Sequence, residues 1–174
     1  QLQQIISRRI DPLKPAVLTV ASFHAGSAFN VIPSTASISG TVRTFDTDVQ
    51  NKIIVHMEKI VATACQNAGA SYKFNYTKGY PAVMNHPEET ALLVQSATQV
   101  VGTEQTINIA PSMGAEDFAY YLQKVPGTYF FTGAGNEDKG IIYPHHHAKF
   151  DIDEEAMMIA AKVLLTAAID FLNQ

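Results

Sequence analysis

The sequence predicts a mixed α/β protein made of two unlike parts. Over residues 1–80 the chain alternates in the order helix, strand, strand, helix, strand, as in a βαββαβ sandwich that lacks its first strand. After a proline-bounded stretch at residues 81–87, helices and short apolar strands alternate, as in one layer of an α/β domain. The chain has 174 residues, of which 47% are hydrophobic, and this is enough for one domain or two small ones.

The first part starts on a helix without a capping residue. Leu2, Ile5 and Ile6 recur at helical spacing, and neither a capping residue nor a methionine precedes them. Residues 16–23 (AVLTVASF) are rich in β-forming residues and predict a strand, which leads into a connection rich in glycine and proline at 24–34. We therefore expect the chain to be a piece of a longer protein that begins within a helix.

A second strand is predicted at residues 35–45. Ile38 and Val42 alternate with polar residues, so the pattern indicates a half-buried strand whose polar face carries Arg43.

A long helix follows this strand. Its start can be capped by Asp46 or Thr47, and Gly69 can close its end. Residues 70–80 alternate aromatic and polar side chains and predict a third strand.

The second part is predicted to contain three helices and two strands. The helices are expected at residues 88–102, 116–125 and 153–172, and the strands at 106–110 and 128–135.

Composition excludes some functions. The net charge is −4 with no basic cluster, so we expect no nucleic-acid partner. No apolar run approaches the ~18 residues of a membrane span, so we expect no membrane association. A single cysteine, Cys65, rules out an internal disulfide and favours a cytoplasmic location.

The most conspicuous polar motif is the run His145–His146–His147. Neutral imidazole is a common metal ligand, but neighbouring side chains in an extended segment point to opposite faces. At most His145 with His147, or His146 alone, could bind one ion, and an ordinary polar surface loop remains the alternative. The acids that follow (Asp151, Asp153, Glu154 and Glu155) could be metal ligands, although they more often cap a helix and complement its dipole.

Three further positions are candidates for substrate contacts. Gly114 precedes a helix and offers backbone N–H groups to an anion, unless it merely belongs to a capped helix start. Arg43 can bind a carboxylate with two hydrogen bonds or can be solvated. Asn30 can contact the substrate or can simply be a turn residue.

Three segments taken together resemble a known family. GSAFNVIPSTASISGTVRTF, MGAEDFAYYLQKVPGTYFFTG and HHAKFDIDEEA are similar to the second half of bacterial N-acyl-amino-acid amidohydrolases. This group includes the hippurate and auxin-conjugate hydrolases and belongs with the aminoacylases and the carboxypeptidase-G type of metallopeptidase.

The resemblance implies a metal-dependent enzyme of two domains. Residues 1–80 would be a partial ferredoxin-like lid and dimerisation domain, and residues 81–174 the closing segment of an α/β metallopeptidase catalytic domain. The complete enzyme would use two divalent ions (zinc, manganese or cobalt) to cleave the amide bond of N-acyl amino acids or small peptides, as a homodimer formed through the lid.

The resemblance also assigns residues. The family's last metal ligand lies four residues before the phenylalanine of F-x-x-D-E-E and corresponds to His146. Asn30, Arg43 and Gly114 match the positions that hold the substrate.

The family's other metal ligands and its general base match nothing here. We therefore expect no catalytic residue in this chain and no activity from it alone. A non-catalytic association domain remains the alternative, as does a separate metal site that includes Glu116 or Asp117.

Overall fold

The computed structural model describes residues 1–173 and divides the chain into two compact units. The first unit comprises residues 1–82 and 112–116, and the second comprises residues 83–111 and those from 117 onward. The boundary at Ala82 falls within the proline-bounded stretch. The return of residues 112–116 to the first unit was not expected from the sequence.

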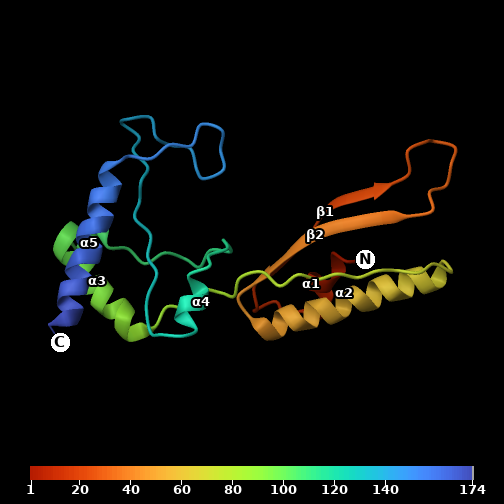
Figure 1. The fold of residues 1–174 in the computed structure, drawn as a ribbon, viewed down its shortest axis with the longest axis horizontal. Coiled ribbons are helices and arrows are strands. Elements are labelled where there is room, and N and C mark those ends of the chain that lie inside the picture. Colours follow the sequence, from red (N-terminus) through yellow and green to blue (C-terminus); the bar gives the residue numbers. More distant parts are fainter. Residues whose placement is uncertain (174) are drawn as a thin grey trace. The chain divides into compact units, whose positions relative to one another are not determined.

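The first unit contains four elements (Figure 1), which are α1 (Gln4–Arg9), β1 (Ala16–Ala25), β2 (Ala36–Thr44) and α2 (Thr47–Asn67). The strands pair antiparallel, with Val17 opposite Arg43 and Leu18 opposite Val42. The register shifts between Val20 and Ser22. The predicted order of helix, strand, strand and helix is confirmed.

The core of this unit lies between the two helices and one end of the hairpin. Its buried residues are Ile5, Ile10, Leu18, Val49 and Ile53. β2 contributes Val42 as a partly buried neighbour of this cluster, whereas the side chain of Ile38 is 51% exposed. The alternating pattern of β2 therefore gives partial burial only near its carboxyl end, because the cluster formed with α1 and α2 reaches the strand there.

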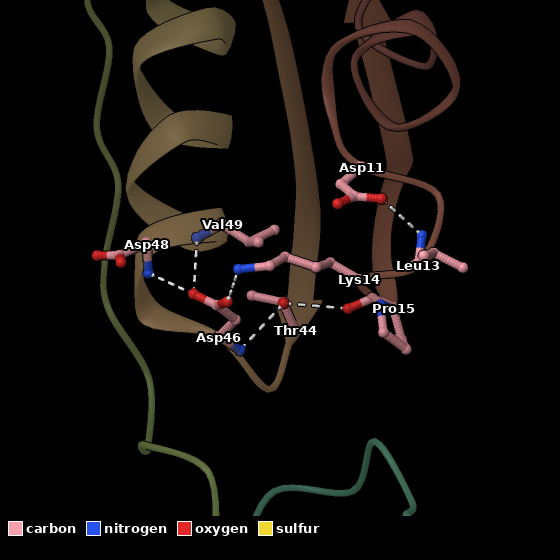
Figure 2. A network of polar contacts seen from close by, with 8 residues as sticks. All are labelled: Asp11, Leu13, Lys14, Pro15, Thr44, Asp46, Asp48 and Val49. Carbon is pink, nitrogen blue, oxygen red and sulfur yellow. Dashed lines mark hydrogen bonds and ion pairs between the residues drawn. The ribbon is translucent and has the colours of Figure 1, made fainter.

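Local signals define both ends of α2. Asp46 Oδ1 accepts hydrogen bonds from the backbone N–H groups of Asp48 (2.8 Å) and Val49 (3.1 Å). Figure 2 shows Lys14 reaching the same carboxylate, at 2.5 Å from Nζ to Oδ2. At the other end Gly69 adopts a φ of +63°, a backbone conformation that glycine adopts readily.

The strand predicted at residues 70–80 does not form. The sheet in the described residues contains only β1 and β2. Residues 70–80 are extended and lie beside α2, where Lys78 Nζ donates to Asn51 Oδ1 at 3.1 Å. In a βαββαβ sandwich the last strand pairs with the first strand, which is the strand that the sequence pattern lacks. Without that partner the alternating segment has no ladder to join.

The regular elements of the second unit are helices, namely α3 (Pro87–Val101), η1 (Thr103–Gln105), α4 (Ala119–Leu122) and α5 (Glu155–Leu172). Helices α3 and α5 pack against each other. Leu93 on α3 and Val163 on α5 are buried. The two long helices are thus confirmed, although α5 begins two residues later than predicted.

Three other predictions for this unit are corrected. Residues 106–110 and 128–135 belong to no strand, and the helix predicted at 116–125 is reduced to α4 with adjoining turns. The main chain of Tyr129 pairs with the side-chain amide of Asn85 and not with a strand. Tyr129 N–H donates to Asn85 Oδ1, and Asn85 Nδ2 donates to the carbonyl oxygen of Tyr129, both at 2.8 Å. Apolar segments of this kind form strands only beside other strands, and the described chain supplies none here.

Within residues 1–173 no helix combines the length and the apolar character that crossing a membrane requires.

Candidate metal ligand and substrate-binding residues

His146 lies in an exposed loop and has an unusual backbone conformation. Its φ is +68°, and it is the only non-glycine residue with a positive φ in the part of the chain that the structure describes. The loop is shaped by turns in which His147 N donates to Pro144 O (3.2 Å) and Phe150 N donates to His147 O (3.0 Å). Such strained residues are found disproportionately at functional sites.

The rings on either side of His146 are engaged with aromatic neighbours. The His147 ring stacks on Tyr143, with centroids 4.3 Å apart and planes at 10°. The His145 ring meets Phe150 edge-on at 4.7 Å. The backbone N–H of Lys149 also donates to Nδ1 of His147 at 3.1 Å.

These contacts distinguish His146 from the other two histidines. The closest ring contact of His146 is with His145, at 6.5 Å between centroids. Because the flanking rings are held by packing, His146 is the member of the run whose imidazole is most available to a ligand. The role of His146 as a metal ligand stays a prediction.

The described chain does not contain a complete metal site. Among residues 1–173 there is no group of three or more histidine, cysteine, aspartate or glutamate side chains placed to hold an ion. The separate metal site considered for Glu116 or Asp117 thus gains no support. An exposed imidazole suits one position in the coordination shell of a divalent metal.

Arg43 and Gly114 are brought together within the first unit. Arg43 Nη1 donates to the carbonyl oxygen of Met113 at 2.5 Å. The backbone N–H of Gly114, one residue further on, donates a long hydrogen bond of 3.4 Å to Ser112 Oγ. The guanidinium of Arg43 therefore binds the main chain at Met113, next to the backbone N–H of Gly114.

Asn30 is not brought to this pair. It lies in the exposed connection between β1 and β2, and no hydrogen bond joins it to Arg43 or Gly114 in the described residues. A hollow of about 430 Å³ in the same connection is lined by residues that include Gly26, Val31 and Pro33, but not Asn30. The role of Asn30 stays a prediction.

Two further residues matter to this geometry, and Gly40 was not singled out in the sequence. A Cβ on Gly40 would lie 2.1 Å from the carbonyl oxygen of Thr19, so only glycine allows the close strand pairing three residues before Arg43. Asp153 was expected to cap a helix, and it does accept from Glu155 N at 3.3 Å. Its shorter hydrogen bonds, however, come from residues 136–139.

Asp153 is held by two donors from residues 136–139. Lys139 Nζ donates to Oδ1 at 2.8 Å and Asn136 Nδ2 donates to Oδ2 at 2.6 Å. These two hydrogen bonds, that of Lys139 first, lower the pKa of Asp153 to about 2. No local sequence signal predicts that Lys139 and Asn136 bind Asp153, because they lie 14 and 17 residues away from it in the chain.

Comparison with known proteins identifies the family to which this chain belongs. Residues 10–170 match the model of peptidase family M20/M25/M40, and the chain belongs to this family. It is 50% identical over 170 residues to YhaA of Bacillus subtilis, which carries the name of an amidohydrolase. It is 39% identical over 169 residues to the N-acetyl-L-cysteine deacetylase of the same organism.

A solved structure agrees with this assignment. The YXEP protein of Bacillus subtilis, described as a dinuclear metal-binding peptidase of the M20 family, matches with a TM-score of 0.78 and 30% identity. The match covers 98% of this chain and 45% of that structure. The alignment with YhaA likewise covers 98% of this chain but only 43% of YhaA. The chain thus spans less than half of the length of these relatives.

Proposed function

We propose that this chain is the carboxyl-terminal portion of a metal-dependent amidohydrolase that cleaves the amide bond of N-acyl amino acids or small peptides. The observation that carries the proposal is the position of His146. It occupies a left-handed backbone conformation between two aromatic-packed histidines, in a chain that belongs to the M20 family. In this proposal His146 binds one of two divalent ions, which can be zinc, manganese or cobalt.

The other residues have roles in holding the substrate. Arg43 retains guanidinium donors beyond the one that binds Met113 O, and it can pair with the substrate carboxylate. The N–H of Gly114 lies one residue away from that contact and can add a hydrogen bond. Asn30 would hold the acyl end. The metal ions would supply polarisation of the amide carbonyl and activation of water.

Activity would require the rest of the protein. This chain covers 43% of YhaA and offers no group of three metal-binding side chains within residues 1–173. Helix α5 also exposes apolar side chains on several of its faces, including Ile159 (37%), Leu164 (56%) and Ile169 (50%). A helix that is apolar all round normally lies inside a larger core, so this surface supports a missing partner segment.

A chimera with a relative tests the proposal. This chain would replace the matching 170 residues of YhaA, and metal content would be measured together with hydrolysis of a panel of N-acyl amino acids. We expect the chimera to hold two ions per chain and to cleave the substrates that YhaA cleaves. We expect the isolated 174 residues to bind at most one ion and to cleave none.

Two variants sharpen this test. His146→Ala should lose one ion from the chimera, whereas His147→Ala, the matched control, should retain both. A fully metal-loaded and active 174-residue chain would contradict the proposal, and so would a His146→Ala chimera that keeps both ions.

The second candidate is an association domain without catalysis. It is favoured by the two-stranded sheet, which leaves unpaired strand edges in the described residues, and by the exposed hairpin pair of Phe23 (64%) and Ile38 (51%). Homodimer formation through this unit is part of both candidates. A chimera that light scattering shows to be a monomer up to high concentration would count against this homodimer.

A cytoplasmic location remains proposed on the single cysteine and is testable by cell fractionation.

A further inference from the structure

The loop that carries His146 is closed at its base. Asp153 N donates to the carbonyl oxygen of Ala134 at 2.8 Å, so residues 134 and 153 are joined directly. Inside this loop Asn136 and Ile141 exchange two backbone hydrogen bonds, at 2.9 Å and 2.8 Å. The loop therefore consists of a tight turn at 136–141 followed by a longer arm at 142–152, which carries His146.

One carboxylate joins the turn to the start of α5. Asp153 receives Nδ2 of Asn136 on one oxygen and Nζ of Lys139 on the other, at 2.6 Å and 2.8 Å. The side chain of Asp153 is only 13% exposed, whereas that of Lys139 is 49% exposed. Asn136 is the shared residue, because its main chain pairs with Ile141 while its side chain binds Asp153.

Both ends of the arm that carries His146 thus depend on Asp153. The arm leaves the turn at Ile141, which is paired with Asn136, and it ends at Asp153 itself. Fixing both ends of a loop reduces the conformations open to the residues between them. The left-handed backbone of His146 is costly, and it persists only if the surrounding structure holds it.

We propose that Asp153 is a positioning residue for His146: its carboxylate, bound by Asn136 and Lys139, keeps the 142–152 arm in the conformation that presents the imidazole. The inference rests on the proposed function, in which His146 is a metal ligand. It assigns Asp153 no contact with metal or substrate.

Asp153→Asn in the YhaA chimera tests this role. Asparagine caps a helix as well as aspartate does, so the variant keeps the helix start while removing the charge that Lys139 binds. With Co²⁺ as the probe, affinity measured from the visible absorption of the bound ion should fall about 10-fold, by analogy with residues that orient metal ligands. Amide hydrogen exchange over residues 142–150 should become faster.

Three variants serve as controls. Glu154→Gln removes the same charge from the same helix end, and the Glu154 carboxylate has no hydrogen-bond or ion-pair partner among the described residues. It should change neither Co²⁺ affinity nor exchange. Lys139→Met should reproduce part of the loss, and Lys139→Arg should preserve the wild-type behaviour because it keeps the positive charge.

The outcomes separate this inference from the proposed function. Wild-type Co²⁺ affinity in Asp153→Asn, together with loss of an ion in His146→Ala, would overturn the positioning role and leave the ligand assignment standing. Retention of both ions in His146→Ala would overturn both. Equal losses in Asp153→Asn and Glu154→Gln would show a general charge effect and would also overturn the positioning role.

Discussion

The hydroxyl of Ser96 on α3 donates a hydrogen bond of 2.7 Å to the Oδ2 atom of Asp170 on α5. Ser96 is wholly inaccessible to solvent, and its hydroxyl also reaches the carbonyl oxygen of Leu92 within its own helix. This polar link joins the two long helices that form the second unit.

Ser96→Ala should therefore destabilise the second unit. We expect the free energy of unfolding to fall by about 1 kcal/mol, the usual net value of a hydrogen bond. The measurement is urea denaturation of the YhaA chimera. Asp170→Asn, which keeps an oxygen acceptor for the hydroxyl, should cost less than Ser96→Ala, and the reverse order would show that the hydrogen bond does not matter.

The pair of Lys14 and Asp46 should make stability depend on pH. The hydrogen bond from Lys14 lowers the pKa of Asp46, and the bond to Asp46 raises the pKa of Lys14. The lowered pKa means that the contribution of Asp46 is complete above the unfolded value of about 3.9 and is lost as pH falls through the folded pKa. The raised pKa means that the contribution of Lys14 is complete below about 10.4 and is lost as pH rises through its folded value.

The measurement for this pair is the stability difference between the chimera and its Asp46→Asn variant across pH. The difference should be constant near neutral pH and should shrink below about pH 4. Asparagine keeps the capping oxygen, so the remaining difference reports the charge. A difference that does not change between pH 6 and pH 2 would contradict the prediction.

Gly40 should tolerate no side chain. A Cβ there would approach the carbonyl oxygen of Thr19 to 2.1 Å, a distance that requires the two strands to separate. We expect Gly40→Ala to cost about 2 kcal/mol or more, as overpacking does. Gly79→Ala is the control, because no atom lies within 4 Å of its added Cβ. Similar melting temperatures for the two variants would show that the strands adjust without cost.

Arg43 should contribute to substrate binding and not to metal binding. In the chimera, Arg43→Ala should lower kcat/KM by about 10- to 100-fold, the effect of losing a charged hydrogen bond. Arg43→Lys should restore only part of this, since lysine lacks the planar fork that grips a carboxylate. Metal content, measured in parallel, should stay at the wild-type level in both variants. Loss of metal from Arg43→Ala would instead indicate that the variant disturbs the fold.

The helices could be predicted from the sequence because their signals are local. Asp46 caps the start of α2, Gly69 ends it in a left-handed conformation, and Pro87 opens α3. Each signal acts within one helical turn, so the residues that decide the helix are neighbours in the chain. The strands β1 and β2 were predictable for a related reason, since the β-forming composition of one and the alternation of the other are visible within each segment.

The choice of His146 depended on the resemblance. Spacing within the histidine run left either His146 or the pair of His145 and His147. The structure shows that the two flanking rings, those of His145 and His147, pack on Phe150 and Tyr143. Ring packing of this kind depends on how the loop folds and could not be derived from the order of the residues.

By itself, the sequence determined the three long helices α2, α3 and α5, the strands β1 and β2, the family motifs and the position of Arg43 on a polar strand face. Only the tertiary structure decided that residues 70–80, 106–110 and 128–135 stay out of a sheet, and that Asp153 binds Asn136 and Lys139. The physical reason is the same in both cases. A strand and the carboxylate of Asp153 are each stabilised by partners far away in the chain, and an alternating pattern or an acidic residue does not say whether those partners are present.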